Sequence, residues 1–143
     1  MQNVTKMRIN KPAGEVYEAF ADPARIGNFW FSSSSERWES GKIITLIYKE
    51  YNAQVDIHVL EAQAGQRIVF RWGGEANTVT MTFREPEPGV TILEIVEAGF
   101  RDDDPELLAK LVDNKEGWVF VLTCLKGHLE SGAVQLRTGL VKD

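Results

Sequence analysis

Five short runs rich in β-branched and aromatic residues follow one another with little more than a turn between them. These runs cover residues 42–51, 53–62, 66–73, 77–85 and 89–98. Glycine, asparagine or proline residues stand at the junctions, as is typical where one strand ends and another begins. Connections this short leave no room for a crossover helix, so neighbouring strands must run antiparallel. With a weaker run at 3–10, the pattern predicts a meander of about six strands.

Between the first strand and the rest of the meander, the apolar spacing becomes helical. Residues 11–22 carry apolar side chains at helical spacing, and Pro12 suits the first turn. Asp22-Pro23 breaks this helix, and Asp22 can cap a second short helix over 23–30. We therefore expect two short helices between the first and second strands.

A long helix near the chain end provides the cover that a one-sided meander needs. Asp104 with Pro105 is a typical helix start, Gly117 predicts a break or kink within 112–117, and Gly132 is the expected stop. The main helix is therefore expected over about 114–131. Its inner face is a continuous apolar stripe formed by Trp118, Leu122, Leu125 and Leu129.

The order of these elements predicts an α+β fold. A curved antiparallel sheet of six to seven strands would wrap around the long C-terminal helix, because neither can bury its apolar face alone. At 143 residues, the chain is expected to form a single domain over 1–143.

Four segments resemble a known family in the family's own order. They are "PAGEVYEAFADPARIGNFW", "VLEAQAGQRIVFRW", "VTMTFREPEPGVTILEIVEAGF" and "EGWVFVLTCLKGHLE". Together they cover nearly the whole chain. They resemble the SRPBCC (START-like, Bet v 1-like) superfamily, and within it the activator of heat-shock-protein-90 ATPase homologue group.

The resemblance implies a helix-grip fold, in which the sheet holds the C-terminal helix and can leave a cavity between them. Relatives bind lipids, hormones and polyketides, some catalyse cyclisation or hydrolysis, and others stimulate the ATPase of the chaperone. The resemblance to this superfamily therefore implies a fold that can enclose a ligand, and it does not by itself assign a reaction or a ligand.

Charge and cysteine content narrow the classes of partner. The net charge is −5 and the 16 basic residues are scattered, which argues against nucleic acid. No apolar run approaches the roughly 20 residues that cross a bilayer, so no membrane partner is expected. The N-terminus lacks a signal-peptide pattern, and one cysteine excludes an intrachain disulfide, so we expect a cytoplasmic protein. With two histidines and one cysteine, no metal or other cofactor is predicted.

Few residues are candidates for acid–base chemistry. His58 lies on the strand face opposite Ile57 and its apolar neighbours, which indicates a solvated position. Glu97 shares a face with inward residues, so it could reach a cavity with Arg71 or Arg84 as partner. Its place at a strand end favours the alternative that it lies in water. No catalytic residue is assigned.

Large rings are unusually numerous for this length and favour either core packing or a lined cavity. If a cavity exists between the sheet and the helix, eight residues are the expected ligand-binding set. They are Trp30, Trp38, Phe70, Trp72, Met81, Glu97, Trp118 and Leu122.

Three functions follow, in this order. The first is binding of a small apolar or amphipathic molecule in that cavity. The second, from the resemblance, is a protein-interaction module that acts on the chaperone. The third is a cyclase- or hydrolase-type enzyme with Glu97 or His58 as acid or base, and catalysis is the less favoured outcome.

Overall fold

Short turns join the strand segments into one sheet. Within residues 1–74 and 76–142, which the computed structural model describes, seven strands form an antiparallel sheet in the order β1-β7-β6-β5-β4-β3-β2. Their bounds are β1 Gln2–Ile9, β2 Ser33–Ser34, β3 Ile43–Tyr48, β4 Ala53–Gln63, β5 Arg67–Trp72, β6 Thr78–Glu87 and β7 Val90–Ala98. The first strand closes against the last, with Gln2 opposite Ala98. The predicted meander is confirmed.

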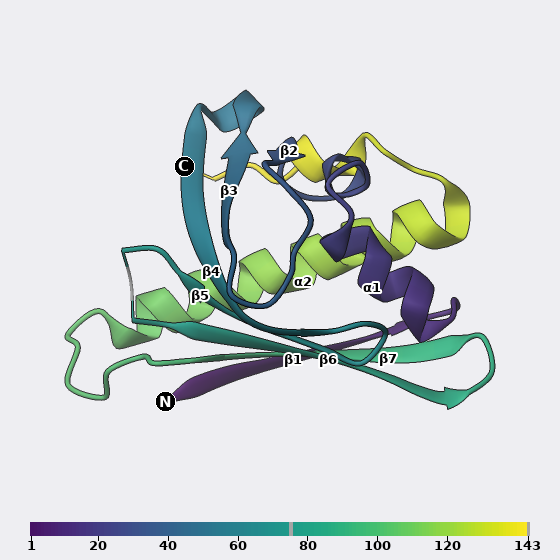
Figure 1. Ribbon diagram of the computed structural model, residues 1–143. Helices are drawn as coiled ribbons and strands as arrows, with labels where there is room; N and C mark the ends of the chain where they lie inside the picture. Colours follow the sequence, from purple (N-terminus) through teal and green to yellow (C-terminus); the bar gives the residue numbers. More distant parts are fainter. Residues whose placement is uncertain (75, 143) are drawn as a thin grey trace.

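The sheet is strongly curved and holds one long helix. In Figure 1, β1, β6 and β7 form one shallow layer, while β3 and β4 rise away from it. The long helix α2 (Leu107–Ser131) runs across the concave side, and α1 (Ala13–Ala21) lies beside it. This is the helix-grip arrangement that the resemblance implied.

The second short helix is reduced to a single 3-10 turn, η1 (Ile26–Asn28). The Asp22 carboxylate accepts a hydrogen bond from the Ala24 N–H at 2.9 Å, as expected of a cap. Glycine and asparagine then follow, and both are poor helix formers. A Cβ at Gly27 would lie 2.8 Å from the Ser32 carbonyl oxygen, so this turn is fitted tightly to the next segment. Two further 3-10 turns are η2 (Lys49–Tyr51) and η3 (Leu136–Thr138).

The predicted break in the C-terminal helix is wrong. α2 is continuous for 25 residues through Gly117, and it begins seven residues before the expected start at 114. Asp104 accepts a hydrogen bond from the Glu106 N–H at 2.8 Å, so the start signal lies just ahead of the helix. One interior glycine costs only about 1 kcal/mol against alanine, which tertiary packing outweighs. Gly132 ends the helix as expected, with a left-handed φ of 74°.

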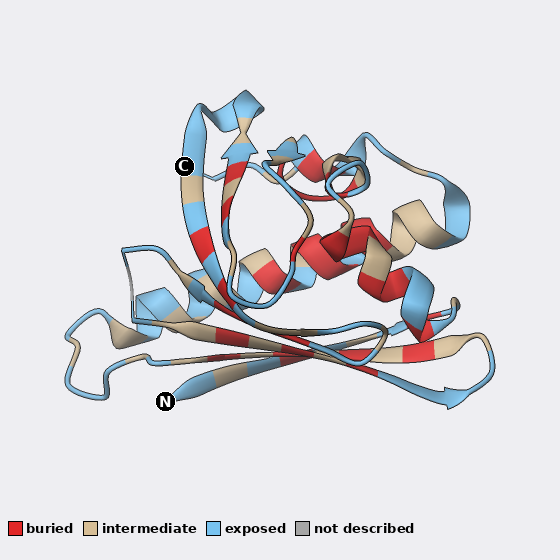
Figure 2. Cartoon of the chain, in the orientation of Figure 1, coloured by how far each residue is buried: buried red, intermediate tan, exposed pale blue. Residues whose placement is uncertain are grey.

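Buried residues gather on the concave face of the sheet and on the inner sides of α1 and α2 (Figure 2). Phe20, Trp38 and Phe70 are fully buried, and the Trp38 ring lies 5.5 Å from the Phe70 ring. This cluster fills the interior beneath α1. Among the described residues, no helix is long and apolar enough to cross a membrane.

Candidate functional site: a tryptophan-lined cavity

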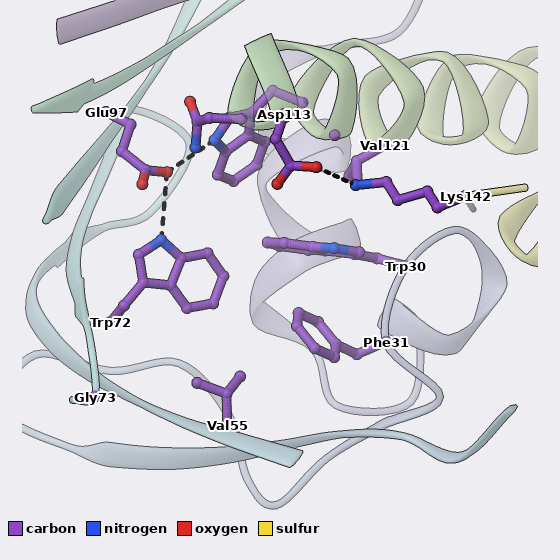
Figure 3. Close-up of a pocket in the computed structure, with 12 residues that line it drawn as sticks. Trp30, Phe31, Val55, Trp72, Gly73, Glu97, Asp113, Val121 and Lys142 are labelled. Carbon is purple, nitrogen blue, oxygen red and sulfur yellow. Dashed lines mark hydrogen bonds and ion pairs between the residues drawn. The ribbon is translucent and has the colours of Figure 1, made fainter. Parts of the chain in front are cut away.

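One part of the space between the sheet and α2 is hollow. The cavity has a volume of about 520 Å³ and lies between the ends of β5 and β7, the first half of α2 and the Trp30-Phe31 segment. Figure 3 shows Trp72 and Glu97 on one side of this hollow and Trp30 and Phe31 on another. A hollow of this size falls within the range of small-molecule sites.

Aromatic rings form most of the wall. The Trp30 ring centre lies 5.2 Å from that of Trp118 and 6.2 Å from that of Trp72, the latter nearly perpendicular. Phe31 packs on Trp30 at 4.9 Å. Each ring is held by its neighbours in tilted or edge-to-face contacts, which favours a rigid, preformed apolar surface.

Glu97 is the polar centre of this surface. It lies on the inner face of β7 after Thr91, Leu93 and Ile95, and only 3% of it is exposed. One oxygen, Oε1, accepts hydrogen bonds from the Trp118 indole at 3.0 Å and the Trp72 indole at 3.3 Å. The other, Oε2, accepts one from the Asn77 amide at 2.9 Å. These donors satisfy a group that would be costly to bury alone.

A charged pair stands at the mouth of the cavity. The Lys142 ammonium lies 2.7 Å from Asp113 and 3.7 Å from Glu116. The Asp113 carboxylate is the main cause that raises the pKa of Lys142 above its ordinary value. Both side chains of the closer pair are largely exposed, at 49% for Lys142 and 70% for Asp113, so this contact contributes little stability by itself.

Arg137 fixes the segment that follows α2, residues 132–142, which carries Lys142 and is called the tail below. This arginine is 7% exposed and donates to the Trp30 carbonyl at 2.6 Å. It also donates to both Glu50 oxygens, at 2.7 and 3.0 Å, and its guanidinium stacks 4.9 Å from the Tyr48 ring centre. The Arg137 guanidinium holds the pKa of Glu50 at about 2. Burial raises the pKa of Tyr48 to about 12.

A second hollow of about 380 Å³ adjoins the first on the Arg137 side. It is bordered by Tyr48, Phe120 and Arg137, and it shares Trp30 and Gly117 with the larger cavity. The anchored tail therefore forms part of the wall of both spaces.

The structure brings four of the eight expected ligand-binding residues to the larger cavity: Trp30, Trp72, Glu97 and Trp118. The other four do not line it. Trp38, Phe70, Met81 and Leu122 have no exposed surface and belong to the packed core. Contact of any of the eight with a ligand stays a prediction.

Two expectations about Glu97 are wrong. It does not lie in water at a strand end, because α2 and the end of β5 cover it. Its partners are two indoles and an amide, whereas Arg71 and Arg84 are exposed on the sheet. The strand extends only one residue beyond Glu97, but the helix starts early enough to pass over this end.

The other reactive side chains lie away from the cavity. His58 is exposed on the outer face of β4, as predicted. Cys124 is buried in α2, and desolvation raises the pKa of its thiol, which suits an inert position. Within the described part of the chain, no group of three or more His, Cys, Asp or Glu residues could hold a metal ion.

Several wall residues escaped the sequence prediction. Asp113 and Asn114 lie at the cavity because α2 continues through the expected break, which puts Asn114 one turn before Trp118. An uninterrupted helix pattern from residue 107 would have found them. Lys142 lies there only because the tail folds back, and no local pattern predicts that contact.

A family model and a solved structure match nearly the whole chain. The model described as "Activator of Hsp90 ATPase homolog 1-like protein" matches residues 10–130. The chain is also similar to the crystal structure of the protein SSP2350 from Staphylococcus saprophyticus, with 45% identity and a TM-score of 0.85 over 96% of this chain and 98% of that one. A comparison of the sequence with curated proteins found no match.

More distant structures share the fold alone. DynU16, a putative protein in the dynemicin biosynthetic locus, has 21% identity and a TM-score of 0.82 over 95% of this chain and 49% of its own. The Aha1 dimer from Colwellia psychrerythraea has 14% identity and a TM-score of 0.77 over 92% and 98%. From the match over residues 10–130, the chain belongs to the Activator of Hsp90 ATPase homolog 1-like family, as its sequence motifs indicated.

Proposed function

We propose that this protein binds a small apolar or amphipathic molecule in the cavity beside Trp30, Trp72 and Trp118. The observation that carries the proposal is a hollow of about 520 Å³ walled by large rings around one buried carboxylate. Rigid apolar walls with a few fixed polar groups are the usual form of a small-molecule site. The rings would supply apolar contact, and Glu97 would orient the molecule.

Gly117 offers a direct way to test the cavity. It borders both hollows, and a Cβ built there meets no atom within 4 Å. A phenylalanine at this position would project into the empty space, whereas an alanine would leave most of it free. Gly117→Phe and Gly117→Ala are therefore a matched pair that differs in how much of the hollow is filled.

The experiment is a fluorescence titration with N-phenyl-1-naphthylamine, a neutral apolar probe that brightens in dry surroundings. We expect the wild type and Gly117→Ala to bind it, and Gly117→Phe to bind at least about tenfold more weakly, which corresponds to 1.4 kcal/mol. Circular dichroism shows that each variant is folded. Equal affinity in the two variants, or no binding by the folded wild type, would reject the proposal.

A second candidate is an interaction with the Hsp90 chaperone, which the family description favours. The Aha1 dimer from Colwellia psychrerythraea has the same fold, which supports this candidate at the level of the fold alone. The test is the ATPase rate of purified chaperone with and without this protein, and an unchanged rate rejects the candidate. Both candidates fit a cytoplasmic location, which the single unpaired cysteine favours.

A further inference from the structure

The charged side chains at the cavity differ in whether they have a partner of opposite charge. The mouth carries one ammonium, Lys142, and it is engaged by Asp113 at 2.7 Å. Inside, the Glu97 carboxylate is 3% exposed and accepts only from neutral indole and amide N–H groups. Among the described residues, no Lys, Arg or His forms an ion pair with it. A buried negative charge therefore faces the hollow without a cation.

The cationic side chains of a neighbouring hollow have acidic partners of their own. Arg101 and Lys110 border a neighbouring hollow that Glu97 also lines. Arg101 lies 3.1 Å from Asp103, and Lys110 lies 2.5 Å from Asp104. These pairs leave Glu97 to its three neutral donors.

The aromatic wall complements the same charge. The indole N–H groups of Trp72 and Trp118 lie in their ring planes and point at Glu97, so the edges of these rings meet the carboxylate and their faces are turned to the space beside it. Trp30 lies within 6.2 Å of both rings. Tryptophan faces attract cations through the ring quadrupole, and sets of such rings recognise ammonium groups.

We infer that the cavity selects an organic cation, an amine or quaternary ammonium on an apolar or aromatic body, whose charge sits beside Glu97 and against the faces of the cavity tryptophans. This inference rests on the proposed function and names its ligand class. An anionic head group is disfavoured there, because it would meet a carboxylate that is already desolvated. A neutral molecule gains the apolar contact but neither the ring attraction nor the ion pair.

Two isosteric benzene derivatives and one anionic derivative separate charge from size. Phenyltrimethylammonium is the cation, tert-butylbenzene is its neutral isostere, and benzoate is the anion. Their dissociation constants are measured by quenching of intrinsic tryptophan fluorescence in the wild type and in Glu97→Gln. Glutamine keeps the length of the side chain and a carbonyl acceptor for the indoles, while it removes the charge.

The wild type is expected to bind the cation at least about tenfold more tightly than the isostere and to bind benzoate weakest. In Glu97→Gln the ratio of the affinity for the cation to the affinity for tert-butylbenzene should fall at least about fivefold. Equal affinities of the wild type for cation and isostere would overturn the inference, and this comparison needs no variant. The same holds if Glu97→Gln keeps the full preference. In both cases, binding of the neutral naphthylamine probe would still support the proposed function.

Discussion

Glu97 shows how one carboxylate can be kept within an aromatic wall. The alternation of side chains along β7 places Glu97 on the inner face of the strand. Three side chains from three different segments then donate hydrogen bonds to its two oxygens. Without it, Trp118 would carry a buried, unsatisfied N–H and Trp72 a partly buried one. The carboxylate therefore also fixes the orientation of two of the rings that define the cavity.

Replacing Glu97 by leucine tests this structural role. Glu97→Leu removes the acceptor for two indoles and one amide, so we expect the free energy of unfolding to fall by about 2–4 kcal/mol. Glu97→Gln keeps an acceptor and should lose about 1 kcal/mol or less. Urea denaturation followed by circular dichroism measures both. A leucine variant as stable as the wild type would mean that the indoles are satisfied in another way.

At the scale of elements, α2 joins the sheet, the cavity and the tail. The helix is long enough to pass over the end of β7, and Gly117 leaves room for the hollow where a side chain would otherwise project. The helix contains a second glycine, Gly127, where a Cβ would lie 2.9 Å from Leu136 Cδ1. The two positions therefore differ in the space around them.

Replacing each of the two glycines by alanine is expected to change the free energy of unfolding by a different amount. Gly117→Ala should raise the free energy of unfolding by about 0.5–1 kcal/mol, because alanine favours the helix and meets no neighbour. Gly127→Ala should gain less, because Leu136 must move. Urea midpoints of the two variants measure this. A loss of stability in Gly117→Ala would show that the surrounding space is not empty.

The Arg137–Glu50 contact predicts a dependence on pH. The folded pKa of Glu50 is about 2, well below its ordinary value of 4.5, because Arg137 donates to the carboxylate. A depressed folded pKa contributes stability that is fully present above pH 4.5 and is lost as pH falls through about 2.

Thermal unfolding of the wild type and Glu50→Gln measures this contribution. The wild type should melt at a higher temperature at pH 7, and the difference should narrow as the pH falls from 4.5 towards 2. Limited proteolysis of the tail should follow the same trend. A difference that does not change with pH would show that the ion pair does not hold the tail.

The bounds of helices and strands were easier to predict from the sequence than whether an inward side chain lies in a packed core or beside a cavity. The turn residues placed the strands of the meander to within a few positions, because glycine, asparagine and proline act locally. The helix start failed because Gly117 was given more weight than tertiary packing provides. Phe70 and Met81 were expected between the sheet and the helix, and both do face the interior, but strand alternation could not tell that this part of the interior is filled.

At the scale of the whole molecule, the protein is a curved sheet around a helix with a solid core beneath α1 and a hollow near the start of α2. Three tryptophans line the hollow, and the fourth, Trp38, is fully buried in the core. Each indole carries one N–H, so the molecule contains its own set of probes for occupancy of the cavity.

The central claim is that a small molecule enters this hollow, and indole N–H resonances in a two-dimensional ¹H–¹⁵N spectrum test it most directly. Titration with N-phenyl-1-naphthylamine should shift the resonances of Trp30, Trp72 and Trp118 and leave Trp38 nearly unchanged. Tryptophan-to-phenylalanine variants assign the four signals. Unchanged cavity resonances at saturating probe, or a largest shift at Trp38, would contradict the claim.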